Sequence, residues 1–372
     1  MPPSRNRPQR TQEDVDREAR ARWDSLFVEA DAREHAISRI SLVAYMDDSD
    51  NEFSTLAPKY DYAVTVQGME GVLKMCDFAP REFEKLWDVV EDHVLSNWNV
   101  GRGKKSTNSP KDVLFMTLAA LKHCGSWDTM SGMFEMDSSP FQKMVKKFLT
   151  MLEPYRYDTF VKVEETRWTM RELMLTRSTF KNFPCARYAT DVTFQHSDRP
   201  TGNFNEAKKF YSGKHHLYGH KVEVSVLPKG IATNCTAWSP AATSDYNMFL
   251  DNAEFHHSAM QKLEGEADLN DEGPVQDRFK NDWAILVDKG YQGLQRGFRT
   301  IQPKRKARGV PPLSADENRE NDRISHDRSL WGVFSHKWAW DRNTYNMYFR
   351  VCLAATKFHV GCNPLRREDG EY

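Results

Sequence analysis

The sequence lacks the features of several broad protein classes. None of its six cysteines forms a CxxC pair. This disfavours a zinc site or a disulfide framework and favours a reducing compartment, the cytosol or the nucleus. No apolar run approaches the roughly 20 residues that a membrane helix needs, so we expect no membrane association. The N-terminal segment is charged and lacks the apolar core of a secretory signal.

An excess of charge of one sign is also absent. The 52 basic and 53 acidic residues give a formal net charge of -1. Any nucleic-acid binding must therefore come from local basic patches. With 39% hydrophobic and 28% charged residues, the composition suits a folded protein, and 372 residues suffice for two or three domains.

Helical patterns dominate the first half of the chain. Residues 80–98 place apolar side chains on one stripe of an amphipathic helix. Between 101 and 152, Ser109–Pro110 and Ser139–Pro140 each read as a helix start. Two short helices joined by a tight polar turn, the second rich in lysine, form a helix-turn-helix pattern. On the pattern alone, an ordinary helical hairpin is the simpler interpretation.

Strand patterns appear after residue 184. The predicted strands are 186–195, 216–228, 231–239 and 283–288, and the second and third form a hairpin. Helices are predicted at 244–263 and 342–360. The order of elements indicates an α/β domain that follows a helical region.

Two of these strands carry an aspartate, Asp191 in "YATDVTF" and Asp288 in "ILVDKGY". If the two strands are neighbours in one sheet, both carboxylates point into the same crevice. Paired carboxylates suit Mg²⁺ or Mn²⁺, which can promote phosphoryl transfer. Taken singly, each aspartate fits a turn or cap residue better.

Several stretches together resemble the PIF/Harbinger type of DDE transposase. They are "ATDVTFQ", "KKFYSGKHHLYGHKVEVSVLPKGI", "SPAATSDYNMF", "LVDKGYQG" and "SLWGVFSHKWAWDRNTYNMYFRVCLAATKFHVGCNPLR". With the helix-turn-helix pattern, which sits where such transposases carry a DNA-recognition segment, the resemblance covers about residues 101–366. It implies an RNase H-like (retroviral-integrase-like) mixed sheet with flanking helices. It also implies that Asp191 and Asp288 are catalytic metal ligands.

The family's third acid is a glutamate in a Val-Glu-Asn context, shortly before the "LW" segment. This context does not occur in "NRENDRISHDRSLWGVF" (318–334), where Glu320 and Asp327 are the candidates. Without this acid a two-metal site loses a main ligand, and in-line transfer loses its positioning. The resemblance therefore leaves two functions open. One is metal-dependent cleavage and strand transfer on DNA, and the other is a non-catalytic, domesticated DNA-binding protein that keeps the fold.

Basic residues gather in a few places. Contacts with DNA phosphates are predicted for Lys104, Lys105, Lys143, Lys146, Lys147, Lys304, Arg305, Lys306 and Arg308. The run "PKRKAR" also resembles a nuclear-localisation patch, so we expect a nuclear protein. For such short runs a solvated loop is the ordinary alternative. His215, His216 and His220 have no carboxylate or cysteine at ligand spacing, and we interpret them as strand or loop residues.

The predicted organisation has five parts. They are a disordered tail (1–22), a helical region of unknown role (23–100), a helix-turn-helix-like DNA-binding region (101–183), an RNase H-like nuclease domain (184–366) and a second tail (367–372). Double-stranded DNA at transposon ends or target sites is the partner that the resemblance implies. A homo-oligomer and an accessory DNA-binding protein are further implied partners.

Overall fold

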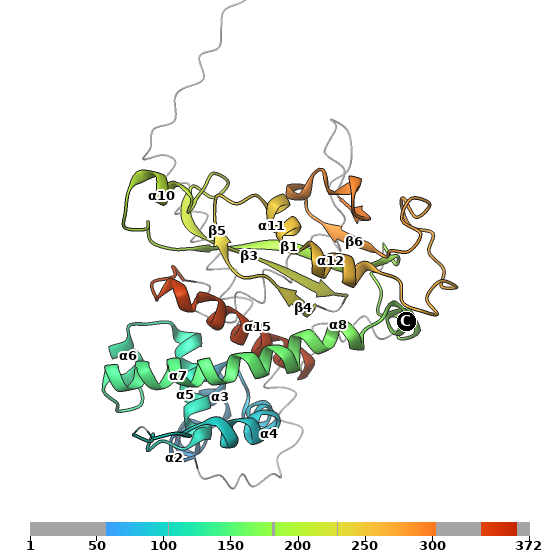
Figure 1. The fold of residues 1–372 in the computed structure, drawn as a ribbon. Helices are drawn as coiled ribbons and strands as arrows, with labels where there is room; N and C mark the ends of the chain where they lie inside the picture. Colours follow the sequence, from blue (N-terminus) through green and yellow to red (C-terminus); the bar gives the residue numbers. More distant parts are fainter. Residues whose placement is uncertain (1–56, 103, 181–182, 229, 303–335, 363–372) are drawn as a thin grey trace, which may run out of the picture.

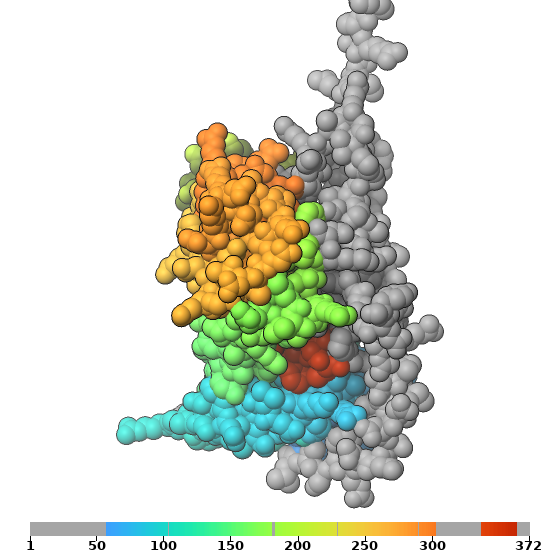
Figure 2. All heavy atoms as spheres, turned by 90° about the vertical axis from the view of Figure 1, so that its right-hand side faces the viewer, coloured from blue at the N-terminus to red at the C-terminus, as the bar shows by residue number. Residues whose placement is uncertain are grey.

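The computed structural model describes residues 57–102, 104–180, 183–228, 230–302 and 336–362. Within these ranges a mixed sheet lies above a layer of helices, and the C-terminal helix runs between the two (Figure 1). Seen from the side, the strands and the first helices form two ends of one elongated body (Figure 2). No helix in the described part of the chain is long and apolar enough to span a membrane.

Several predicted features lie outside the described residues. They are the two tails (1–22 and 367–372), the third-acid candidates Glu320 and Asp327, and the basic residues Lys304, Arg305, Lys306 and Arg308.

Helices fill the first part of the described chain. They are α2 (Pro58–Tyr62), η1 (Ala63–Gln67), α3 (Gly68–Cys76), α4 (Pro80–Asn97), α5 (Pro110–His123), α6 (Trp127–Gly132), α7 (Ser138–Tyr157), η2 (Asp158–Lys162), α8 (Val163–Arg167) and α9 (Met170–Leu175). The amphipathic helix predicted at 80–98 is confirmed as α4.

Helix α5 is the centre of this layer, since every residue from Lys111 to Leu121 is buried. A helix that is buried all round needs no polar face. Its predicted start is confirmed. The Ser109 hydroxyl accepts a hydrogen bond from the backbone N–H of Asp112 at 3.1 Å, and Pro110 occupies the first turn.

Helix α7 begins at Ser138, slightly earlier than predicted, with Asp137 as the N-cap residue. Pro140 still lies in the first turn, where its missing N–H costs no hydrogen bond. The helix buries one apolar stripe against α5 and α15, made of Phe141, Met144, Val145, Phe148, Leu149 and Leu152. The lysines of α7 lie away from this stripe.

The sheet has the strand order β2-β3-β1-β6-β7, with β4 and β5 also paired to β3. Its strands are β1 (Ala186–His196), β2 (Tyr211–Ser212), β3 (Leu217–Leu227), β4 (Ile231–Cys235), β5 (Ser239–Pro240), β6 (Ala284–Val287) and β7 (Thr300–Ile301). Strands β1, β3 and β4 are antiparallel, which confirms the predicted hairpin. Strands β1, β6 and β7 are parallel.

The remaining helices connect or cover the strands. They are α10 (Phe204–Lys208), α11 (Asp245–Asp251), α12 (Ala253–Met260), η3 (Lys289–Tyr291), η4 (Leu294–Arg296), η5 (Arg342–Thr344) and α15 (Tyr345–Cys362). The single helix predicted at 244–263 is thus two helices, which meet at Asn252.

The two faces of the sheet pack on different helices. On one face, Ala189 and Val224 join the apolar cluster that contains α5, α7 and α15 residues. On the other face, Tyr188, Ile285 and Val287 pack with α11 and α12 residues. Neighbouring residues of a strand point to opposite faces, which explains this division. Asp191, two residues after Ala189, therefore lies on the α15 face.

Candidate functional site

The two predicted aspartates lie side by side at the centre of the sheet. Thr190 of β1 pairs in parallel register with Val287 of β6, and each is followed by an aspartate, Asp191 and Asp288. Neighbouring strands are about 4.8 Å apart, and residues in parallel register share a face. The fold thus brings together two carboxylates that are 97 residues apart in sequence (288 − 191).

The surroundings of Asp191 disfavour its ionised form. Burial raises the pKa of its carboxyl group to about 6. The N–H of Val192, which donates to Oδ1 at 2.8 Å, and the ammonium group of Lys214 lower this pKa, whereas Asp288 and Asp245 raise it. A cation between the carboxylates would remove the repulsion among them.

A third carboxylate, Asp245, stands at the edge of this site. It lies in the first turn of α11, whose N-cap Ser244 accepts a hydrogen bond from the N–H of Asn247. Its Oδ1 forms an ion pair with Lys221 Nζ at 2.9 Å. A β-carbon built on Gly290 would come within 2.4 Å of Asp245 Oδ2. Asp245 therefore packs directly against the turn that follows Asp288.

The turn after Asp288 is held by Tyr291. The backbone N–H of Tyr291 donates to the carbonyl of Asp288 at 3.2 Å, and Gln302 donates to the carbonyl of Tyr291 at 2.7 Å. The Tyr291 hydroxyl donates to Glu223 Oε2 at 3.4 Å. These contacts hold the segment "DKGYQG" as a turn of fixed shape.

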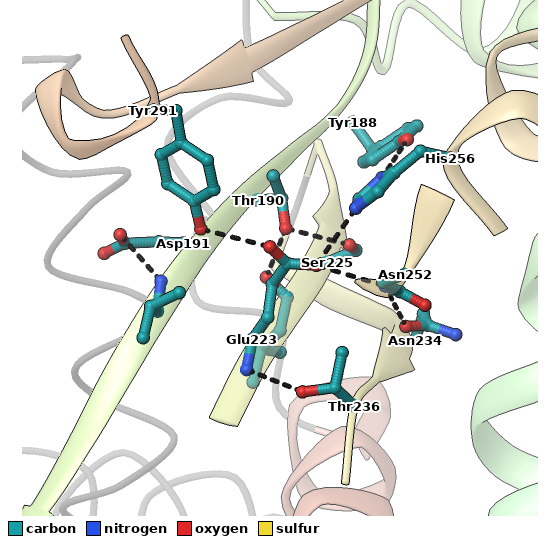
Figure 3. A network of polar contacts seen from close by, with 12 residues as sticks. Tyr188, Thr190, Asp191, Glu223, Ser225, Asn234, Thr236, Asn252, His256 and Tyr291 are labelled. Atoms are coloured by element: carbon teal, nitrogen blue, oxygen red, sulfur yellow. Dashed lines mark hydrogen bonds and ion pairs between the residues drawn. The ribbon is translucent and has the colours of Figure 1, made fainter. Parts of the chain in front are cut away.

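Behind the turn lies a buried polar network (Figure 3). Glu223 Oε1 is 3.0 Å from His256 Nε2 and accepts a hydrogen bond from Asn252 at 3.1 Å. The other ring nitrogen of His256 is 2.8 Å from the Tyr188 hydroxyl. The Glu223 and His256 side chains are fully buried. A buried carboxylate needs such partners, so this network fixes β3, α12 and the Tyr291 turn relative to one another.

The Asp191 and Asp288 carboxylates suit a divalent cation such as Mg²⁺. In the described part of the chain, no group of three or more His, Cys, Asp or Glu side chains could hold a metal ion by itself. Asp191 and Asp288 nevertheless match the donor set of Mg²⁺, which is usually held by one or two carboxylates with substrate phosphates and water. The pair fits a cation that shares its coordination with a substrate.

Comparison with known proteins agrees with this geometry. Residues 190–351 match the family model of the DDE superfamily endonuclease. The matched range contains Asp191, Asp245 and Asp288. Members of this superfamily generally use divalent metal ions, and DDE nuclease domains act on DNA. No curated protein and no solved structure matches the chain.

Five of the basic residues predicted to contact DNA lie before the DDE match, in two neighbouring segments. Lys104 and Lys105 are exposed in the loop before α5. On α7, Lys143 and Lys147 are exposed and Lys146 is half-buried. All five residues are thus accessible, at least in part, to a phosphate backbone.

The loop before α5 packs against α7. Ser106 Oγ and Asn108 Nδ2 lie 3.8 and 3.6 Å from the sulfur of Met144 on α7. The ammonium group of Lys147 stands 5.2 Å from the ring centre of Trp98, at the start of the loop. The lysines of the loop and those of α7 therefore belong to one side of the helical layer.

Proposed function

We propose that this protein is a transposase-derived DDE endonuclease of the PIF/Harbinger type. It would cleave phosphodiester bonds of DNA with a divalent metal ion and would join strands. The observation that carries this proposal is the parallel register that sets Asp191 beside Asp288 within the DDE match. The segments that resemble PIF/Harbinger transposases support the subtype.

The strand order supports an RNase H-like fold. The antiparallel strands β1, β3 and β4 come in this order along the chain, with the short strand β2 between the first two. Strand β6 then joins β1 in parallel on its other side. This arrangement puts the end of β6 next to the middle of β1. Two acids on non-consecutive strands then lie side by side on one face of the sheet, as metal-dependent phosphoryl transfer requires.

In this proposal the protein residues hold and orient the reacting groups. Asp191 and Asp288 would hold Mg²⁺ or Mn²⁺, which when bound would polarise the scissile phosphate and activate the attacking oxygen. The nucleophiles would be water in cleavage and a 3′-hydroxyl in strand transfer. Glu320 and Asp327 stay the predicted candidates for the third acid. Asp245 is the third carboxylate near the pair, but it is engaged by Lys221.

A second candidate function is DNA binding without cleavage. The Asp245–Lys221 ion pair favours it, because a lysine already neutralises this nearby carboxylate. In both cases Lys104, Lys105, Lys143, Lys146 and Lys147 would bind the DNA backbone. A nuclear location, a homo-oligomer and an accessory DNA-binding protein are parts of the same proposal.

Calorimetric titration with Mn²⁺ tests the metal site first. Wild-type protein should release or absorb heat on binding, and an Asp191→Asn/Asp288→Asn double variant should not. Asp251→Asn, which changes an exposed carboxylate on α11, is the matched control. Equal binding by all three proteins would exclude the aspartate pair as the metal site.

Cleavage of an end-labelled DNA duplex then separates the two functions. The nuclease proposal requires Mn²⁺-dependent products that disappear in the double variant. Binding of the duplex without such products would favour the second candidate. If Lys143→Gln/Lys147→Gln weakens duplex binding, the slope of log K against log salt should become shallower, by about 0.9 for each phosphate that the variant no longer neutralises. Lys74→Gln, at an exposed lysine of α3, serves as the control.

A further inference from the structure

The segment that connects β1 to β3 forms an ordered flap, defined here as residues 204–216. It contains α10 and the short strand β2, which pairs with the beginning of β3. Its backbone is tied down at two further points. The N–H of Gly219 donates to the carbonyl of Phe210 at 2.8 Å, and the N–H of Ala242 donates to the carbonyl of Lys209 at 3.0 Å.

Aromatic contacts fix the flap to β1. The His215 ring stacks on Phe194 with 4.4 Å between ring centres and 12° between planes. The Phe194 ring lies where a side chain on Gly219 would begin, since a β-carbon there would come within 2.6 Å of it. Glycine at 219 thus permits the close packing that holds the flap. The guanidinium group of Arg342 stands 4.4 Å from the Phe210 ring centre and secures the other side.

The outer surface of the flap is basic and aromatic. Lys208, Lys209 and Lys214 are exposed, against one glutamate, Glu206. The rings also face solvent, since Phe204 is 68% exposed and Tyr211 is 38% exposed. Exposed aromatic rings interleaved with lysines are typical of surfaces that bind unpaired nucleic acid, where rings stack on bases and ammonium groups contact phosphates.

The Tyr211 ring is held in a fixed orientation. It meets the Tyr218 ring edge to face at 5.3 Å, and its hydroxyl lies 3.5 Å from His216 Nδ1. A ring that is already oriented loses little conformational entropy when a base stacks on it. Tyr211 is therefore better suited to stacking than a freely rotating surface tyrosine.

The flap also lies close to the aspartate pair. The flap contacts β1, the strand that carries Asp191, through Phe194, whose side chain points to the opposite face of the sheet from Asp191. The Lys214 ammonium group is near enough to lower the pKa of Asp191. A phosphate that enters between Asp191 and Asp288 would meet two negative charges, and Lys214 is positioned to offset this repulsion.

We infer that the flap binds an unpaired DNA strand next to the aspartate pair, with Tyr211 stacking on a base and Lys214 contacting a phosphate. This inference rests on the proposed function. It adds a substrate feature, because a duplex with an unpaired end would be bound more tightly than a blunt duplex. Tyr211 and Lys214 are positioning residues here, since neither holds the metal or reacts.

Fluorescence anisotropy on the full chain tests the inference. The probes are a blunt duplex and the same duplex with a 3′ single-stranded overhang that contains 2-aminopurine. We expect Tyr211→Ala to weaken overhang binding by about 5- to 150-fold, the range for loss of one stacked base. Tyr211→Phe should restore both the affinity and the quenching of 2-aminopurine. Lys214→Gln should weaken overhang binding and lower its salt dependence, and Lys214→Arg should restore both.

Matched controls are Tyr62→Ala and Lys74→Gln, at an exposed tyrosine and an exposed lysine of the helical layer. The inference is overturned if wild-type protein binds the overhang and both flap variants bind it equally well. Equal weakening for blunt duplex and overhang would also overturn it, because the flap would then be a general anion-binding surface. In both cases the proposed function survives. If wild-type protein binds neither DNA, the proposed function and the inference fail together.

Discussion

Asp245 and Gly290 are packed so closely that residue 290 has no room for a side chain. A β-carbon at 290 would come within 2.4 Å of Asp245 Oδ2 and 3.2 Å of Cγ. Asp245 cannot move away freely, since Lys221 holds its other oxygen at 2.9 Å. The absence of a side chain at Gly290 thus lets the turn after Asp288 lie against α11.

Gly290→Ala should therefore destabilise the protein by about 1–3 kcal/mol, the usual cost of overpacking. Because the displaced turn carries Asp288, affinity for Mn²⁺ should fall as well. Urea unfolding and calorimetry measure the two effects. Gly297→Ala is the matched control, since a β-carbon there has no neighbour within 4 Å. Equal free energies of unfolding for the two variants would contradict this account.

Asp191→Asn should stabilise the metal-free protein at high pH. Burial raises the pKa of Asp191 to about 6, so the folded state binds this proton more tightly than the unfolded state does. The resulting stability is fully present below the unfolded pKa, near 4, and is lost as the pH rises through about 6. The asparagine variant escapes this loss, and its gain at pH 8 should be at most about 3 kcal/mol.

Urea unfolding at pH 5 and pH 8 measures this difference. The advantage of Asp191→Asn over wild type should grow between the two values, and Asp251→Asn should show no such growth. Saturating Mn²⁺ should stabilise the wild type alone and reduce the advantage of the variant. A difference that is the same at both pH values would contradict the assignment.

Tyr291→Phe should lower both the stability of the protein and its affinity for Mn²⁺, although Tyr291 does not hold the metal. The change removes the hydrogen bond to Glu223 Oε2 and leaves a buried carboxylate oxygen with one donor fewer, at a cost of about 1–3 kcal/mol. Since the Tyr291 N–H also closes the turn on the Asp288 carbonyl, Mn²⁺ affinity should fall with stability. Tyr188→Phe removes a hydroxyl at the far end of the same network. It should reduce stability and leave Mn²⁺ affinity unchanged, and equal affinities for both variants would refute the link to Asp288.

Asp271→Ala should be strongly destabilising. Its carboxylate accepts two hydrogen bonds from Arg299, both at 2.6 Å, and one from Lys262 at 2.7 Å. The Arg299 side chain is fully buried, so its charge would lose its carboxylate partner, at a cost of about 3–5 kcal/mol. Asp268→Ala, at an exposed position in the same connection, should change the stability by no more than about 0.5 kcal/mol, as is usual for surface sites. Thermal unfolding of both variants provides the measurement.

The sequence was most informative where a pattern is local. The start of α5 at Ser109–Pro110 and the β3–β4 hairpin depend on neighbouring residues, and both are confirmed. The pairing of Asp191 with Asp288 is not local, since it depends on β6 inserting next to β1. The strand pattern linked these two residues only on the condition that their strands are neighbours, and the resemblance to a known family supplied that condition.

The buried network could not be recognised from the sequence. In "HKVEVSV" the alternation places Val222 and Val224 on one face and Glu223 on the other, as in a strand with one solvated face. The structure covers that second face with α11 and α12, which makes Glu223 an interior residue. The resemblance had set Asp245, in "SPAATSDYNMF", at an aspartate of the family pattern. Its local signal, a Ser-Asp pair at a helix start, also fits ordinary capping.

The C-terminal helix α15 has a consequence for how the molecule unfolds. Arg350 donates a hydrogen bond to Glu153 on α7 at 3.1 Å, and Lys357 donates one to Glu164 on α8 at 2.6 Å. The buried apolar residues of α15 share one cluster with those of α7 and of the sheet. The last described element in the sequence thus closes the interior between the first helices and the strands. Displacement of α15 would expose the apolar surfaces of the helical layer and of the sheet together. The two layers should therefore unfold in a single cooperative transition. If DNA binding displaces the helices, α15 would couple that displacement to the strands that carry the aspartates.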